Sequence, residues 1–282
     1  MAICFRCCND VINNGPYSLE ADYFTNFNAA NEGSTENIFT VPYANGSANG
    51  FNWAQMTLHY SSQATFDLAA QPWNGYCALQ EFYDSYDDAD LRKGTYGNQQ
   101  IRGNFIAGPQ YASDGTTRLI DASAEPGDPD GQDLTFDPVM NEIAPGAFRQ
   151  AGARIGKYEY ANGAQQELDN DFVMFRLGGV ILDAAEASYR LGNTATALTL
   201  VNQVRSRTGM ADFTALTDAD MLAERGRELF MEGTRRQDLI RFGQYNRTWF
   251  GKTSASDATK NLMPIPRVQV AANPNLVQNP GY

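Results

Sequence analysis

Beyond residue 170 the apolar residues of this chain adopt the spacing of amphipathic helices, and this change constrains the fold more than any other feature. Apolar or small residues recur every three or four positions, at Val173, Leu177, Val180, Ile181, Ala184, Ser188 and Leu191. A turn at residues 191–193 precedes a second segment, in which Leu198, Val201 and Val204 share one side before Gly209. This spacing predicts a helical hairpin over residues 172–208.

The predicted hairpin resembles a single tetratricopeptide-type unit, a repeat of about 34 residues. One such unit cannot bury its own apolar faces, and the sequence contains no second copy. We therefore expect an apolar stripe that contains Leu177, Ile181, Leu198 and Val201 to be partly uncovered.

Residues 1–170 have a different character. Short apolar runs are broken there by clusters of Gly, Asn, Pro and Asp, which are typical of turns and loops. The expected fold class is mainly α, with a helical region at residues 171–282 and a large loop-rich region with short strands at residues 1–170.

The acidic loop at residues 121–137 is similar in sequence to half of a calcium-binding loop. Asp128, Asp130 and Asp133, together with Gly131, follow part of that pattern. The later Glu that completes such a site is missing at its proper spacing. The sequence therefore favours a solvated acidic loop, and no calcium ion or other cofactor is predicted.

Charge and cysteine content argue against two further kinds of ligand. Lys and Arg total 21 against 33 Asp and Glu, a net charge of -12 that opposes binding to nucleic acid. Cys4 and Cys7 have the C-x-x-C spacing of a zinc site, but Cys8, Cys77 and the single His59 supply no second ligand pair at suitable spacing. No metal site is predicted.

The first residues, MAICFRCCNDVINNG, contain no apolar run of signal-peptide length. Neither Cys7 nor Cys8 follows the small-residue pattern of a lipoprotein cleavage site. No stretch of the chain approaches the roughly 18 uninterrupted apolar residues that a membrane-spanning helix requires.

Acids and arginines alternate in the segment ERGRELFMEGTRRQDLIRFG, residues 224–243. We expect one helix, which begins at Thr217 with Asp220 in a capping box and runs through this segment. The spacing predicts ion pairs of Glu224 with Arg227, of Glu232 with Arg235 and Arg236, and of Asp238 with Arg241. Because such pairing lowers the pKa of a carboxyl group, the pairs favour a structural role over general acid catalysis.

The same segment resembles the C-terminal signature of the SusD/RagB family of outer-membrane nutrient-binding lipoproteins. NLMPIP at residues 261–266 and NPNLVQNPGY at residues 273–282 are also similar to that signature. The resemblance extends back through FRLGGVILDAAEASYRLGN and ALTLVNQVRSRTGM, and more loosely through NGYCALQEFYDSYDDADLRKG and GPYSLEADYFTNFNAANEGSTENIF.

The resemblance implies a protein that holds a glycan or related nutrient at the outer-membrane surface, without catalysis, and passes it to a TonB-dependent transporter. It covers nearly the whole chain but only about the C-terminal half of a usual family member. Members begin with a lipoprotein signal and several tetratricopeptide-like helical pairs. We therefore expect this chain to be a fragment that lacks the N-terminal helical half.

Aromatic residues in the loop-rich region provide candidates for contact with an oligosaccharide or polysaccharide. Aromatic rings stack on the C–H faces of sugars, and neighbouring amides can bond the hydroxyl groups. Among Phe51, Trp53, Tyr60, Trp73, Tyr76, Tyr83 and Tyr86, we expect Trp73, Trp53 and Tyr76, with the amide of Asn74, to form the ligand surface. Trp73 lies between Pro and Gly in QPWNGY, which predicts a turn, whereas Trp53 has core packing as its main alternative.

Two other classes of function remain open from the sequence. A glycoside hydrolase would use two carboxylates, which the many acidic residues could supply, although no pair stands in a recognisable motif. A helical-repeat scaffold for another protein would require several helical units. Neither the particular glycan nor the oligomeric state is predicted.

Overall fold

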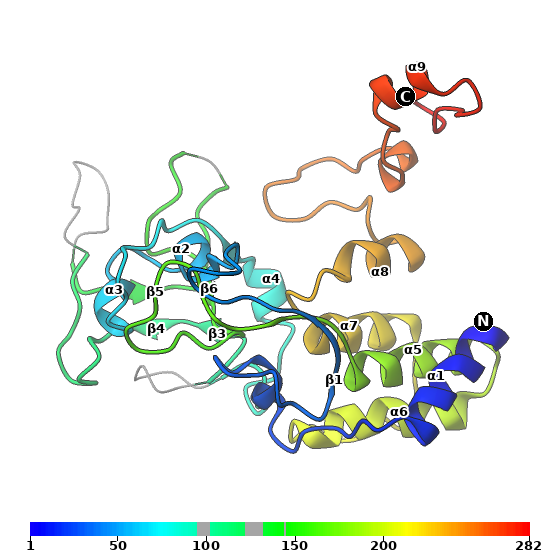
Figure 1. Cartoon of the computed structure of the whole chain (residues 1–282), viewed down its shortest axis with the longest axis horizontal. Helices are drawn as coiled ribbons and strands as arrows, with labels where there is room; N and C mark the ends of the chain where they lie inside the picture. Colours follow the sequence, from blue (N-terminus) through cyan, green and yellow to red (C-terminus); the bar gives the residue numbers. More distant parts are fainter. Residues whose placement is uncertain (95–101, 122–131, 144) are drawn as a thin grey trace.

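The computed structural model describes residues 1–94, 102–121, 132–143 and 145–282. Longer helices lie at the start of the chain and after residue 176, and the part between them carries short helices and strands (Figure 1). The helices are α1 (Ala2–Asn14), α2 (Trp53–Thr57), α3 (Ser62–Thr65), α4 (Gln80–Tyr83), α5 (Leu177–Arg190), α6 (Thr194–Arg207), α7 (Asp218–Glu228), α8 (Arg235–Arg241) and α9 (Arg267–Ala272), with 3-10 turns η1 (Tyr23–Phe27) and η2 (Ala258–Asn261).

The described strands are short and pair antiparallel. β1 (Asn37–Val41) pairs with β7 (Phe172–Arg176), β2 (Cys77–Ala78) and β3 (Phe105–Ile106) flank β6 (Ala153–Ile155), and β4 (Gly108–Pro109) pairs with β5 (Thr135–Phe136). Each pairing joins segments that are distant in the sequence, so the loop-rich region is held by long-range contacts.

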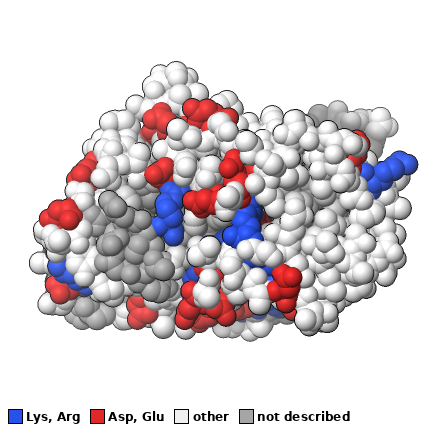
Figure 2. All heavy atoms as spheres, turned by 90° about the horizontal axis from the view of Figure 1, so that it is seen from below, with Lys and Arg blue, Asp and Glu red and all other residues white. Residues whose placement is uncertain are grey.

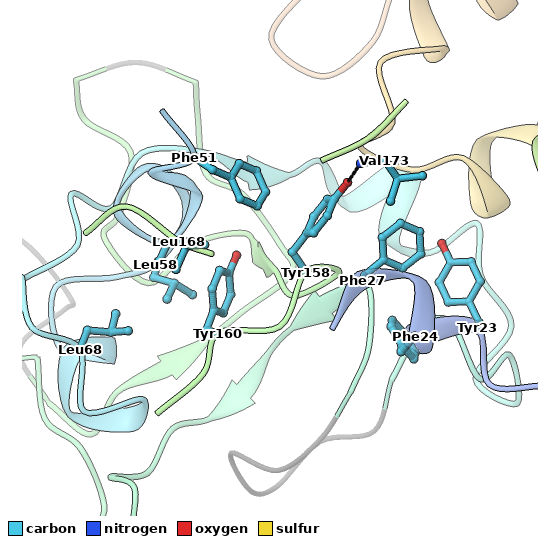
Figure 3. Packing of buried hydrophobic residues seen from close by; sticks show 11 residues of the cluster. Tyr23, Phe24, Phe27, Phe51, Leu58, Leu68, Tyr158, Tyr160, Leu168 and Val173 are labelled. Atoms are coloured by element: carbon cyan, nitrogen blue, oxygen red, sulfur yellow. Dashed lines mark hydrogen bonds between the residues drawn. The ribbon is translucent and has the colours of Figure 1, made fainter. Parts of the chain in front are cut away.

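Val173 lies in strand β7, so its assignment to a helix was wrong, and helix α5 begins at Leu177. The β7 residues are β-branched, aromatic or long side chains that suit a strand, and Thr40 lies opposite Val173 in the ladder. Val173 is buried in an aromatic cluster, where its backbone N–H donates to the Tyr158 hydroxyl at 3.0 Å (Figure 3).

Helices α5 and α6 form the predicted hairpin, but its apolar stripe is covered. Leu177, Ile181 and Val201 are buried and Leu198 is half-buried, so the expectation of an uncovered stripe was wrong. Helix α1 packs on α5 (Figure 1), and Ile12 contributes to the cluster. Tyr17 and Leu19, which follow α1, and residues of α7 complete this core.

The predicted single helix over the charged segment is two helices. Thr217 and Asp220 form the expected capping box at the start of α7. Helix α7 ends at Glu228, because Met231 and Gly233 have backbone φ angles of 60° and 78°, outside the helical region. Helix α8 then begins at Arg235.

The segment after α8 projects beyond the rest of the chain (Figure 1), and every residue from 242 to 282 is at least partly exposed. Its contacts are mainly internal: the Gln278 side chain bonds both backbone groups of Ile265, at 2.8 Å each. The Tyr282 hydroxyl donates to the carbonyl of Leu262 at 3.0 Å. The segment therefore adds little to the buried core.

Helix α1 and the α5–α6 hairpin come from the two different regions expected from the sequence, yet they share one core. The predicted division into a loop-rich region and a helical region near residue 170 is not tested by this shared core and stays a prediction.

Ile181→Ala should lower the free energy of unfolding by about 2–5 kcal/mol, because it removes a fully buried side chain from the core between α5, α6 and α7. Val268→Ala, at a position that is 75% exposed, is the matched control and should change it little. Urea unfolding of both variants measures the difference, and equal stability would contradict the covered core.

Candidate functional site

Glu228, at the end of α7, lies in a buried cluster of ion pairs. Glu228 Oε1 lies 2.7 Å from Arg176 Nη1, and its Oε2 lies 2.9 Å from Arg92 Nη1. Arg207 forms a third ion pair with Glu228. Arg176 and Arg207 also contact Glu36, at 2.7 and 2.5 Å. We call Glu36, Arg92, Arg176, Arg207 and Glu228 the central charge cluster.

The central charge cluster holds its carboxylates ionised. Burial alone would raise the pKa of Glu228, but Arg207, Arg176 and Arg92 together lower it far below the ordinary value of 4.5. For Glu36 too, the attraction of Arg176 and Arg207 exceeds the effect of burial, and the pKa is lowered. A general acid needs a raised pKa, so these two carboxyl groups are unsuited to that role.

Two of the predicted ion pairs are present in the structure. Glu224 Oε2 lies 2.8 Å from Arg227 Nη2, and Asp238 Oδ1 lies 2.6 Å from Arg241 Nη2. Asp238 also lies 3.1 Å from Arg225, which joins α8 to α7.

The predicted partners of Glu232 were wrong. Glu232 lies in the turn between α7 and α8, so helical spacing does not place it beside Arg235 and Arg236. Its carboxylate pairs instead with Lys157 at 2.5 Å and Arg176 at 2.8 Å.

Arg235 and Arg236 bond backbone carbonyl groups instead of Glu232. Arg235 Nη1 donates to the carbonyl of Leu222 at 2.7 Å, and Arg236 Nη2 donates to that of Lys260 at 3.0 Å. These two residues therefore connect α8 with α7 and with the C-terminal segment. Their role is structural, as predicted, but it depends on backbone hydrogen bonds and not on ion pairs with Glu232.

Glu228→Gln should lower the free energy of unfolding by about 3–5 kcal/mol at neutral pH, because it leaves three guanidinium groups short of buried negative charge. Glu32→Gln, at an exposed position, is the matched control. Chemical unfolding monitored by circular dichroism measures both, and an unchanged Glu228→Gln variant would contradict the role of the cluster.

The pH dependence of unfolding gives a separate test of the cluster. Since the folded-state pKa of Glu228 lies below its ordinary value of 4.5, its contribution is present above that pH and is lost as pH falls. The melting temperature of the wild type should therefore drop steeply below about pH 4.5, and that of Glu228→Gln less steeply. Parallel curves for the two proteins would contradict this account.

The excess of acidic over basic residues opposes binding to nucleic acid. Figure 2 shows, for the described residues on one face, acidic side chains in several groups with basic side chains standing in small groups among them. This pattern agrees with the net charge of -12.

The segment QPWNGY, residues 71–76, is hydrogen-bonded to the backbone of helix α2. The backbone N–H groups of Trp73 and Tyr76 donate to the carbonyls of Gln55 and Met56, each at 2.7 Å. Gly75 is required here, because a Cβ atom would lie 2.4 Å from the carbonyl oxygen of Met56. The side chains of Trp73 and Tyr76 are nevertheless 51% and 57% exposed, so two aromatic rings stand on a fixed backbone.

The amide of Asn74 holds this segment in place. Its Nδ2 donates to the carbonyl of Arg149 at 3.1 Å, and its Oδ1 accepts from Arg154 Nη2 at 2.8 Å. Asn74 also has a backbone φ of 54°, a left-handed conformation that asparagine tolerates. Asn74 therefore fixes the backbone of this segment, and its contact with a ligand stays a prediction.

Trp53 lies on the core side of the region. Its ring stacks on Phe51 with centroids 6.0 Å apart, and its indole nitrogen is buried and has no hydrogen-bond partner among the residues that the structure describes. The structure thus brings Trp73, Asn74 and Tyr76 together and leaves Trp53 among the packed aromatic residues.

A cavity of about 500 Å³ opens beside Tyr76, which we call the first cavity. Aromatic and polar side chains from three separate segments line it, among them Tyr60, Asn74, Tyr76, Glu142, Phe148 and Arg149. Phe148 and Arg149 could not be predicted from local sequence, because long-range contacts such as the hydrogen bond from Asn74 to Arg149 bring them to this cavity. Cavities of 300–1,000 Å³ are typical of small-molecule sites.

Within the described residues, no group of three or more His, Cys, Asp or Glu side chains is arranged to hold a metal ion. Asp128, Asp130 and Gly131 of the imitated calcium loop lie outside the described residues, and Asp133 is exposed. The same part of the chain contains no helix long and apolar enough to cross a membrane.

Comparison with solved structures shows the fold. A SusD superfamily protein from Parabacteroides distasonis matches with a TM-score of 0.71 and 20% identity, covering 100% of this chain and 57% of that chain. Surface glycan-binding protein A from Bacteroides thetaiotaomicron, in complex with laminarihexaose, matches with a TM-score of 0.67 and 23% identity, over 98% of this chain and 58% of that chain. The expected SusD-like fold class is confirmed.

Sequence comparison shows the family. The SusD family model matches residues 35–282, so the chain belongs to the SusD family. Starch-binding protein SusD from Bacteroides thetaiotaomicron is 35% identical over 123 residues, which are 40% of this chain and 22% of that protein. SusD-like protein P25 from Formosa agariphila is 25% identical over 98% of this chain and 54% of its own length. The chain thus spans less than two thirds of the length of each relative.

Proposed function

We propose that this chain binds a glycan without catalysis, at a surface formed by Trp73, Tyr76 and the first cavity. The observation that carries the proposal is that both rings are exposed on a backbone fixed to α2. Sugar-binding surfaces need exposed rings whose position is fixed before the ligand arrives, because ordering them on binding would cost affinity. The glycan-binding and starch-binding relatives support the same choice.

The non-catalytic part of the proposal rests on the placement of the carboxylates. A glycosidase needs two carboxyl groups that flank one sugar bond, with one of them at a raised pKa. Among the described residues that line the first cavity, Glu142 is the one acidic side chain. The buried acids of the central charge cluster have lowered pKa values and are paired with arginine.

We further propose that binding takes place at the outer-membrane surface and serves delivery to a TonB-dependent transporter. Membership of the SusD family is the support for this part. To test this part, a TonB-dependent transporter from the same genome is immobilised, and retention of this protein on it is measured with and without bound glycan. Absence of capture under both conditions would contradict delivery by direct contact.

A panel of polysaccharides separates binding from hydrolysis. Retarded migration of the protein in gels that contain one polysaccharide, with no release of reducing ends, is the expected result. Release of reducing ends above that of a boiled sample would favour the glycoside hydrolase.

Trp73→Ala should weaken binding of a retarding glycan by about 0.5–1.5 kcal/mol or more, a roughly 2- to 12-fold higher Kd, because a stacking ring is lost. Trp249→Ala, which removes an indole from the C-terminal segment, is the matched control and should leave Kd unchanged. Isothermal titration calorimetry gives both values. Equal affinity of the Trp73→Ala variant and the wild type would remove Trp73 from the site.

A further inference from the structure

A second, shallower cavity of about 550 Å³, largely open to solvent, lies next to the first and has no role in the site described above. Its lining includes Tyr60, Ser61, Gln63, Asp67, Gln71 and Ile120. Tyr60 lines both cavities, so the two spaces share a wall.

The segment that carries Trp73 runs from one cavity to the other. Gln71 lines the second cavity and Asn74 lines the first, and the exposed ring of Trp73 lies between them in the sequence. Gln55 holds this stretch by two hydrogen bonds. Its side-chain Nε2 donates to the carbonyl of Ala70 at 3.1 Å, and its backbone carbonyl accepts from the N–H of Trp73. The two cavities are therefore held in a constant relation to one indole ring.

Hydrogen bonds also connect the chain segments that line the second cavity. Ser61 Oγ donates to the carbonyl of Ile120 at 3.2 Å, and Ser113 Oγ donates to the carboxylate of Asp67 at 3.0 Å. These bonds link segments 46 and 59 residues apart, so the cavity is built from the tertiary fold. It is not formed by one loop alone.

The chemistry of the second cavity suits uncharged sugar units. Its described lining offers amide, hydroxyl and carboxylate groups, which bond sugar hydroxyls, and the apolar surface of Leu119 and Ile120. Asp67 is the one charged side chain among these described lining residues, so an acidic sugar would be repelled. The first cavity differs, because Arg149 and Arg154 contribute to its lining.

We propose that the second cavity is an additional subsite for the same glycan chain, which crosses Tyr60 and Trp73 from one cavity to the other. The preferred ligand is then a linear oligosaccharide longer than a disaccharide, with uncharged units in the second cavity. This inference rests on the proposed glycan-binding function. Occupying both cavities with one chain makes the second contact intramolecular, which raises affinity without any change in either cavity.

A length series tests the proposal. The probes are the disaccharide and hexasaccharide prepared from whichever polysaccharide retards the protein, for example maltose and maltohexaose for starch, or laminaribiose and laminarihexaose for laminarin. We expect the hexasaccharide to bind at least tenfold more tightly in calorimetry. Gln71→Ala changes an exposed residue of the second cavity, and Tyr76→Ala changes an exposed residue of the first.

Both variants should weaken hexasaccharide binding several-fold, whereas the disaccharide should respond to only one of them. Circular dichroism of each variant checks that the fold is kept. Equal Kd values for the two probes, or a Gln71→Ala variant that binds the hexasaccharide normally, would overturn the extended site and leave the proposed function standing. If no polysaccharide retards the protein at all, the proposed function fails, and the extended site fails with it.

Discussion

The contact on which the rest of the structure depends is the burial of Glu228 among three arginines. Arg92 comes from the loop-rich region, Arg176 from the end of β7 and Arg207 from the end of α6. One carboxylate on α7 therefore fixes the positions of three segments that are far apart in the sequence. A buried guanidinium is costly without a partner, so these segments must meet for the chain to fold.

The central charge cluster lies apart from the proposed ligand surface, and packing connects the two. Strand β7 leads directly into α5, and it also lies against the aromatic cluster that holds Phe51 and Tyr158 (Figure 3). Helix α2 packs on the same cluster through Ala54 and, in turn, carries the segment with Trp73 and Tyr76. The positions of the Trp73 and Tyr76 rings therefore depend on packing that runs from α2 through the aromatic cluster to β7 and the helical hairpin. The buried ion pairs act on these rings only through that packing.

The sequence was sufficient where contacts are local. The capping box of Thr217 and Asp220 and the pair of Glu224 with Arg227 follow from spacing within one helix, and the α5–α6 hairpin follows from two helical segments joined by a short turn. It was insufficient where partners are distant: Glu232 pairs with Lys157, and helix α1 covers α5. The same limit applies to the proposed site. Trp73 was predicted as a ligand residue from its turn, whereas tertiary contacts alone bring Phe148 to the first cavity.

Hydrogen–deuterium exchange, with and without a polysaccharide that retards the protein, tests whether the exposed rings bind the glycan while the charged helices only support them. We expect slower exchange on binding in peptides that contain Tyr60, residues 71–77 and residues 145–151, with no change in residues 218–241. Slower exchange confined to residues 218–241 would contradict it, because the charged helices would then be the binding site and not its support.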